Sequence, residues 1–159
     1  MGVRQSAGLL LFRRTSADPV GVEVLLGHMG GPFWARRDNG GWSIPKGEYE
    51  GVEAPLDAAL REFTEELGLP PPPGPYAPLG EVRQSSGKMI TIWAVEGELD
   101  PALVVPGTFA LEWPRGSGTM QDFPEIDRAA WFGVEAARQK LVKGQVAFLD
   151  RLLATLPSQ

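Results

Sequence analysis

The chain contains no cysteine and a single histidine, His28, among its 159 residues. Disulfides, thiolate zinc sites and cysteine nucleophiles are therefore excluded, and so is a histidine-rich metal centre. No apolar run approaches the roughly 18 residues that a membrane-spanning helix needs, so we expect no membrane partner. A net charge of −5 argues against broad attraction to nucleic acid or anionic lipid. The cytoplasm is the default compartment that we expect.

The length and a hydrophobic fraction of 43% are typical of one globular domain, and we expect residues 1–159 to form it. Hydrophobic patterning predicts strands at residues 4–14, 20–28, 41–44, 79–84, 88–97 and 128–132, with a turn at Asp18-Pro19. Residues 98–124 are expected to be irregular, because prolines and glycines punctuate them. Helices are expected near 54–67, 134–141 and 145–156, with a break at Gly144. This order predicts an α/β fold in which helices sandwich a mixed sheet.

The helix near residues 54–67 has well-marked ends. Pro55 suits a first helical turn, and Gly68 is typical of a left-handed stop. At about 100° per residue, one side of the helix carries the apolar side chains of Leu56, Leu60, Phe63 and Leu67. That side should anchor the helix to the sheet.

A neighbouring arc of the same helix carries Glu62, Glu65 and Glu66. Carboxylates crowded in this way repel one another unless a cation lies among them, and oxygen ligands favour magnesium. The run Pro45-Lys46-Gly47 before the helix predicts a tight turn, in which Gly47 lets a backbone carbonyl approach the same cation. The alternative is an ordinary solvated acidic helix, but the glutamates are bunched rather than interspersed with lysine.

These residues match a known motif. It consists of Gly47, five residues, Glu53, seven residues, Arg61-Glu62, an apolar residue, any residue, Glu65-Glu66, any residue, Gly68 and an apolar residue. The pattern resembles the Nudix box at every fixed position, and only Phe63 is bulkier than the usual aliphatic residue. The resemblance implies a Nudix hydrolase with an α/β/α sandwich fold. Such enzymes cleave the pyrophosphate linkage of nucleoside diphosphate derivatives and use divalent cations, here Mg²⁺ with Mn²⁺ as the alternative.

The resemblance also implies roles for the box residues. Glu65 and Glu66 correspond to metal ligands, and Glu62 to a metal ligand or the catalytic base. A backbone carbonyl at Lys46 or Gly47 would complete the coordination shell. Glu53 and Arg61 correspond to structural support through ion pairs.

Outside the box, we expect a further catalytic carboxylate before the last strand. Glu125 is the candidate, so that Glu62, Glu66 or Glu125 orients or deprotonates the attacking water; Asp127, Asp122 and Glu112 are its rivals. An ordinary loop carboxylate is the alternative interpretation of Glu125. Candidate substrate-binding residues are Lys46, Trp34, Arg36, Arg37 and Lys88, and the alternative interpretation of each is an ordinary loop or turn residue.

The function expected from these residues is metal-dependent hydrolysis of a small nucleotide, with a nucleoside triphosphate or a dinucleoside polyphosphate as the leading substrates. An RNA 5′ end is an alternative that the acidic charge disfavours and the basic pair Arg36-Arg37 keeps open. A non-catalytic nucleotide sensor and a partner-binding domain are further alternatives. Homodimerisation cannot be read from the sequence and stays open.

Overall fold

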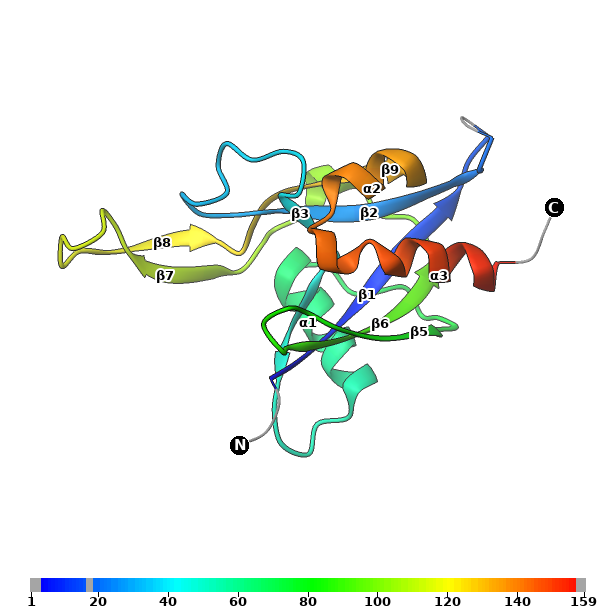
Figure 1. The fold of residues 1–159 in the computed structure, drawn as a ribbon, viewed down its shortest axis with the longest axis horizontal. Helices are drawn as coiled ribbons and strands as arrows, with labels where there is room; N and C mark the ends of the chain where they lie inside the picture. Colours follow the sequence, from blue (N-terminus) through cyan, green and yellow to red (C-terminus); the bar gives the residue numbers. More distant parts are fainter. Residues whose placement is uncertain (1–3, 17–18, 157–159) are drawn as a thin grey trace.

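A computed structural model describes residues 4–16 and 19–156 of the chain (Figure 1). The strands are β1 (Gln5–Arg14), β2 (Val22–Met29), β3 (Trp42–Ser43), β4 (Lys46–Tyr49), β5 (Ala77–Arg83), β6 (Met89–Glu96), β7 (Thr108–Glu112), β8 (Met120–Pro124) and β9 (Ile126–Gly133). The helices are α1 (Pro55–Leu67), α2 (Val134–Lys140) and α3 (Ala147–Thr155), with short 3₁₀ turns η1 (Pro101–Leu103) and η2 (Lys143–Gln145).

Seven of these strands form one mixed sheet. Its main path runs β3-β2-β1-β6-β5, with β9 paired to β2 and β4 paired to β1. β1 and β6 are parallel, and the other pairs are antiparallel. The first part of β1, residues 5–8, pairs with β4, whereas its last part, residues 12–14, pairs with β2. The divergence of β2 and β4 along β1 brings the strand that leads into α1 to the middle of the sheet.

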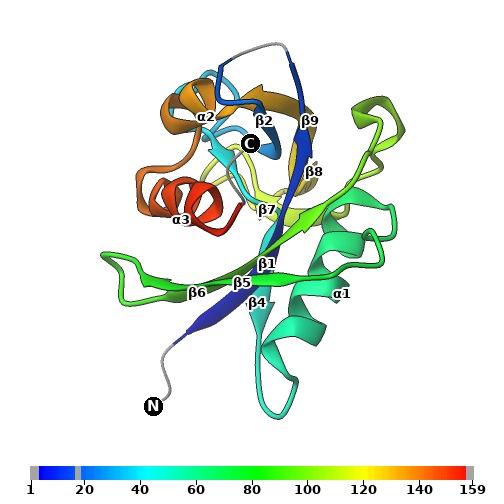
Figure 2. The ribbon, with the colours of Figure 1, turned by 90° about the vertical axis from the view of Figure 1, so that its right-hand side faces the viewer.

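Both faces of the sheet are buried, as the alternation along β1 shows. Leu9 and Leu11 pack in the cluster that contains α1, whereas Leu10 and Phe12 pack in the cluster that contains α2 and α3. Successive side chains of a strand point to opposite faces, so one strand feeds both layers of core. Figure 2 shows α1 on one side of the sheet and α2 with α3 on the other. The expected α/β/α sandwich with a mixed central sheet is confirmed.

The ends of α1 are formed as the sequence predicts. Ala54 is extended, Pro55 begins the first turn, and Gly68 adopts the left-handed conformation with φ of 71°, donating its N–H to the Thr64 carbonyl. The buried residues of the helix are Ala58, Ala59, Phe63 and Leu67, with Leu56 and Leu60 packed partly buried against the same cluster. One face is therefore anchored, and the acidic arc is left beside the β4 strand.

The prediction that residues 98–124 are irregular was wrong in its second half. β7 and β8 pair as a hairpin that projects from the body of the protein (Figure 1). We call this hairpin, residues 108–124, the arm. Pro114, Gly116 and Gly118 lie in the connection between its strands, where the two glycines adopt positive φ. The proline and glycine signals mark one turn rather than a long loop.

Three other expectations had different outcomes. The predicted tight turn at residues 45–47 was wrong, because Lys46 and Gly47 are the first residues of β4 and pair with β1. The predicted break near Gly144 is confirmed by η2, which separates α2 from α3. The expected turn at Asp18-Pro19 falls partly outside the described residues.

Within residues 4–16 and 19–156, no helix combines the length and apolar character that crossing a membrane requires.

Candidate active site

The approach of β4 to α1 depends on Gly47. A Cβ atom built at Gly47 would overlap the carboxylate of Glu62, so only glycine allows the strand and the helix to lie this close. On the opposite strand, a Cβ at Gly8 would overlap the Pro45 carbonyl and Lys46. In the antiparallel pair of β1 and β4, Gly8 lies opposite Lys46 and Ala7 lies opposite Gly47, so strand pairing fixes where Gly47 meets the helix. The backbone of β4 therefore lies directly against one of the predicted metal ligands.

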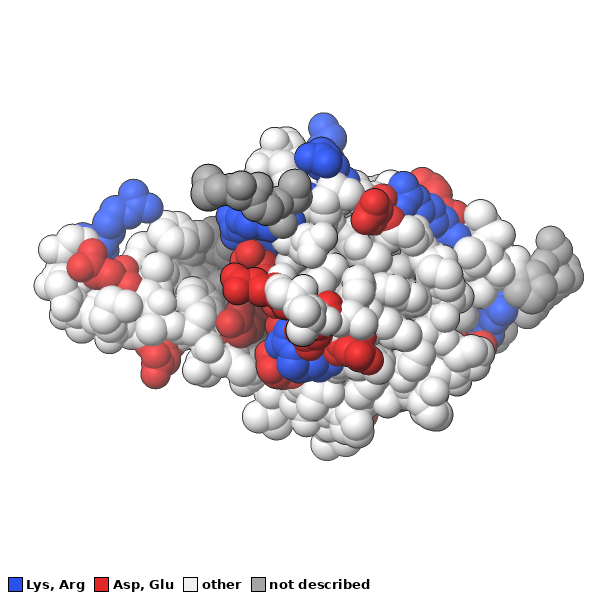
Figure 3. All heavy atoms as spheres, turned by 90° about the horizontal axis from the view of Figure 1, so that it is seen from below, with Lys and Arg blue, Asp and Glu red and all other residues white. Residues whose placement is uncertain are grey.

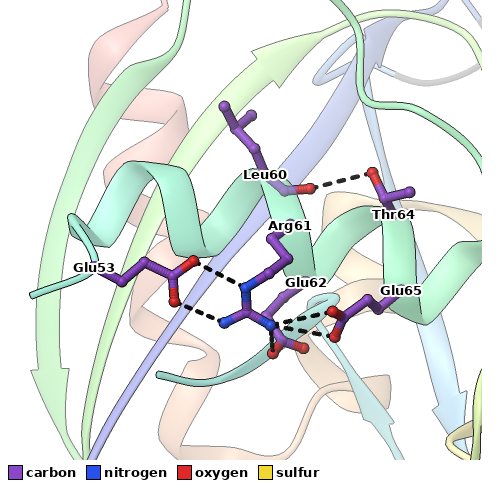
Figure 4. Close-up of polar contacts among 6 residues, drawn as sticks. All are labelled: Glu53, Leu60, Arg61, Glu62, Thr64 and Glu65. Carbon is purple, nitrogen blue, oxygen red and sulfur yellow. Dashed lines mark hydrogen bonds and ion pairs between the residues drawn. The ribbon is translucent and has the colours of Figure 1, made fainter. Parts of the chain in front are cut away.

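Arg61 links the carboxylates of the box (Figure 4). Its Nε and Nη2 donate to the two carboxylate oxygens of Glu53, both at 2.9 Å. Its Nη1 donates to Glu62 at 2.8 Å and to Glu65 at 3.2 Å. The pKa of Arg61 is raised, first by the hydrogen bond with Glu53. The Arg61 guanidinium is thus the cation that three of the box glutamates share. Its bonds to Glu53 also connect the loop before α1 to the helix.

Glu66 lies in a different environment. It is half-buried and makes no such bond with Arg61, and its pKa is raised to about 8, first by burial and next by the charge of Glu125. The neighbouring Glu62 and Glu65 raise it further, and Lys46 opposes them. Burial also raises the pKa of Glu62, against the hydrogen bond from Arg61. Without a cation among them, these carboxylates destabilise each other's charged forms.

Glu125 lies in the connection between β8 and β9, and its charge acts on both Glu62 and Glu66. Its backbone is held at two points, with its N–H donating to the Gly107 carbonyl at 2.7 Å and its carbonyl accepting from Gly30 at 3.1 Å. The structure therefore brings Glu125 to the carboxylates of α1, as expected. Of its three rivals, Asp122 and Glu112 are on the arm, and Asp127 is bonded to His28.

Two lysines lie near β4: Lys46 is its first residue, and Lys88 precedes the β6 residue that is level with the other end of β4. The half-buried Lys46 has a lowered pKa, first because of burial and next because of Lys88, while Glu66, Glu48 and Glu62 act in the opposite direction. Lys88, before β6, forms an ion pair with Glu48 at 3.8 Å. Lys46 is thus close to the acidic arc, and a polyphosphate placed there would meet its charge, whereas Lys88 is held beside Glu48.

The other predicted substrate residues lie in the loop after β2. The Arg37 guanidinium carbon is 5.3 Å from the ring centroid of Trp34, a cation–π arrangement, and Arg36 is exposed. The fully buried ring of His28 positions this loop, because its Nε2 lies 2.6 Å from the Arg37 carbonyl and its Nδ1 lies 2.9 Å from Asp127. His28 is a packed, hydrogen-bonded residue of β2.

The link from His28 to Asp127 was missed at the level of sequence. The two residues are separated by 99 positions and meet because β2 and β9 are neighbours. The only available signal was a lone histidine in an apolar strand, which suggested a hydrogen bond but no partner.

The candidate ligands fit a divalent ion in their chemistry, since they are carboxylate oxygens and the backbone of β4 at Gly47. Within the described ranges, no three acidic or histidine side chains are already arranged around one point as metal ligands. Glu62 and Glu65 are instead held by Arg61. In the face seen from below in Figure 3, acidic side chains gather beside the base of the projecting arm. A cation there would draw carboxylates from Arg61.

Solved structures similar to this chain share its fold. A Caenorhabditis elegans Ap4A hydrolase in a binary complex has a TM-score of 0.61 at 19% identity, with 96% of each chain covered. The NUDIX domain of Shewanella oneidensis NrtR complexed with ADP ribose has a TM-score of 0.64 at 15% identity, with 99% of this chain and 90% of that chain covered.

Sequence comparison gives a local match and a family. An RNA pyrophosphohydrolase of Hahella chejuensis is 43% identical over 53 residues, which make up 33% of this chain and 32% of that protein. The match thus spans about a third of the length of that curated relative. A family model described as the NUDIX domain matches residues 3–152. With nearly its whole length matched, the chain belongs to the NUDIX domain family.

Proposed function

We propose that this protein is a divalent-metal-dependent pyrophosphohydrolase that cleaves the diphosphate linkage of a nucleotide derivative. The observation that carries the proposal is the gathering of Glu62, Glu65 and Glu66 on one arc of α1 against the backbone of Gly47, where burial and then the charge of Glu125 raise the pKa of Glu66 to about 8. Such a cluster is stable in its ionised form only when a cation neutralises it. NUDIX proteins generally use divalent metals, and Mg²⁺, with Mn²⁺ as the alternative, is the ion we propose.

In this proposal Glu65 and Glu66 hold the metal with carboxylate oxygens, and the backbone of Gly47 offers a carbonyl. The bound ion would supply charge neutralisation for the phosphates and lower the pKa of a bound water. Arg61 and Glu53 keep the loop before α1 at the helix, as their paired hydrogen bonds indicate.

The remaining residues would act on the water and the substrate. Glu62, Glu66 or Glu125 accepts the proton of the attacking water as its oxygen bonds to phosphorus and the bridging phosphorus–oxygen bond breaks. Lys46 and Lys88 meet the phosphates. Trp34, Arg36 and Arg37 contact the nucleotide beyond them, from the loop that His28 fixes. The products are a nucleoside monophosphate and a phosphorylated leaving group.

The substrates we propose are nucleoside triphosphates and dinucleoside polyphosphates, because the site combines a phosphate end with exposed aromatic and guanidinium groups. The similar Ap4A hydrolase fold is consistent with the second. The local match to an RNA pyrophosphohydrolase keeps an RNA 5′ end as a second candidate. A single domain over residues 1–159, a cytoplasmic location and a homodimer stay predictions.

The test is hydrolysis of a nucleotide panel with Mg²⁺, with Mn²⁺ and with EDTA, with products separated by chromatography. Glu65→Gln and Glu66→Gln should each lower the rate roughly a thousandfold, because a metal ligand contributes several kcal/mol to stabilising the transition state. Glu50→Gln, an exposed glutamate outside the fixed positions of the box, is the matched control and should retain activity. Full activity in EDTA, or in both site variants, would remove the mechanism; metal-dependent binding without turnover would indicate a sensor.

A further inference from the structure

The loop after β2 runs along the arm from its base toward its tip. A Cβ at Gly31 would lie 3.0 Å from the ring of Phe109, which belongs to the base of β7. Two residues later, the ring of Phe33 meets the ring of Trp113 at a centroid distance of 5.5 Å in an edge-to-face arrangement. The guanidinium of Arg115 lies 5.5 Å from the centroid of the Phe33 ring. We call Phe33, Trp113 and Arg115 the ring platform.

The platform presents aromatic surface to solvent. Phe33 is 55% exposed, although an isolated phenylalanine gains nothing from that exposure, and Arg115 is exposed. A flat aromatic ring flanked by a guanidinium is a stacking surface for a nucleobase, since every base has a π-face. The ring platform is therefore suited to bind the aromatic end of a ligand rather than its anionic end.

The platform is held at a set distance from the carboxylates of α1. Trp113 donates its N–H to the Thr119 carbonyl, and Thr119 precedes Glu125 by six positions along β8. At about 3.4 Å per residue, the Trp113 backbone lies about 20 Å along the arm from Glu125, and Phe33 approaches it from three residues beyond Gly30. The loop side is fixed too, because Gly30 donates to the Glu125 carbonyl and a Cβ at Gly30 would overlap the Pro124 carbonyl.

This separation selects among the candidate substrates. The single base of a nucleoside triphosphate stays close to its own phosphates, whereas a dinucleoside polyphosphate carries a second base at the far end of a longer phosphate chain. An RNA strand would need cations along the arm, but the two strands, TFALE and MQDFP, contain no lysine or arginine and do contain Glu112 and Asp122. The basic residues of this region are confined to Arg115 in the arm's turn and to Arg36 and Arg37 in the loop after β2, so the strands of the arm favour a second base over an extended nucleic acid backbone.

We infer that the ring platform binds the second aromatic base of a dinucleoside polyphosphate whose phosphates lie at the α1 carboxylates. The inference deepens the proposed function and rests on it for the position of the phosphates. Phe33 stacks on the base, Trp113 holds the Phe33 ring through their edge-to-face contact, and Arg115 supplies a guanidinium beside the stack. The platform contributes to binding and substrate choice and takes no part in the chemical step.

The test compares diadenosine tetraphosphate, ATP and a short RNA with a 5′ triphosphate as substrates for wild-type protein and Phe33→Ala. Loss of one stacking ring should raise KM for diadenosine tetraphosphate about tenfold, with kcat and both ATP constants unchanged. Phe33→Trp should restore the low KM. Met120→Ala is the matched control, because Met120 is a 62% exposed arm residue outside the ring platform.

Several results would overturn the inference: an unchanged KM for the dinucleotide in Phe33→Ala, an equal loss on ATP, or a loss confined to the RNA. Calorimetry of diadenosine tetraphosphate binding to Glu66→Gln protein, with and without Phe33→Ala, supplies a readout without turnover. If wild-type protein hydrolyses no nucleotide, the proposed function fails. The ring platform then stands or falls on whether Phe33→Ala weakens that binding while Met120→Ala does not.

Discussion

The carboxylates of α1 stand on a helix packed against a seven-stranded sheet, whereas the rings of Phe33 and Trp113 stand on a loop and a two-stranded hairpin. The helix buries four side chains, Arg61 holds its Glu62 and Glu65, and Gly47 lies close against Glu62. The arm pairs only with itself and has exposed residues along both strands. The groups proposed for the chemical step, which tolerate little displacement, thus lie on α1 and the sheet. The groups proposed to select a ligand lie on the arm and a loop, where sequence changes disturb the core least.

The largest effect should come from adding one methyl group at the rigid site. In Gly47→Ala the new Cβ occupies the space of the Glu62 carboxylate, so β4 or the glutamate must move. Displacement of about 1 Å at a catalytic group costs about a hundredfold, and we expect at least that loss in kcat/KM. Gly144→Ala is the control, because its Cβ would make only ordinary contacts of 3.6 Å with Gln84. Equal activity of the two variants would show that the contact is not needed.

A second, smaller effect is a pH dependence of Tm, which we expect from the carboxylates of α1. The pKa of Glu66 is raised to about 8 by burial and then by Glu125, so the folded protein binds this proton more tightly than the unfolded chain. The resulting stability is complete below the usual glutamate pKa and is lost as pH rises toward and through 8. We therefore expect Tm in EDTA to fall between pH 5 and pH 9.

Magnesium should take the place of the proton and reduce this fall in Tm. Thermal unfolding followed by circular dichroism, with EDTA and with excess Mg²⁺, measures both slopes. In Glu66→Gln the slope in EDTA should shrink, whereas in Glu50→Gln it should stay as in the wild type. A slope that persists unchanged in Glu66→Gln would assign it to another group.

The smallest effect on global stability should come from the arm. Phe109 is half-buried at the arm base, 6.1 Å from Phe123 between ring centroids and beside Gly31. Phe109→Ala should lower Tm by less than about 2 °C, because the arm can open without unfolding the sheet. Native-state hydrogen exchange should show faster exchange of the β7 and β8 amides and no change in β1 and β6. A large fall in Tm would mean that the arm and the sheet unfold together.

The comparison also explains which expectations succeeded. α1 was predicted closely because its apolar stripe, Pro55 and Gly68 are all local signals, and the box glutamates fall on one arc through helical spacing alone. The arm was missed because its strands are five residues long and only half-buried, so their alternation is weak beside the prolines and glycines of the turn. The strand at Lys46 was missed because a Pro-Lys-Gly run also suits a turn.

The sequence by itself determined the acidic helix, the glycine before it and the divalent-metal chemistry that they predict, since those residues lie within 23 consecutive positions. Only the tertiary structure decided which distant groups join them. Glu125 reaches Glu66 because β8 leads into β9 beside α1, and His28 meets Asp127 because β2 pairs with β9. Phe33 meets Trp113 because the loop after β2 follows the arm. Strand pairing depends on contacts across the whole chain, so no local pattern contains it.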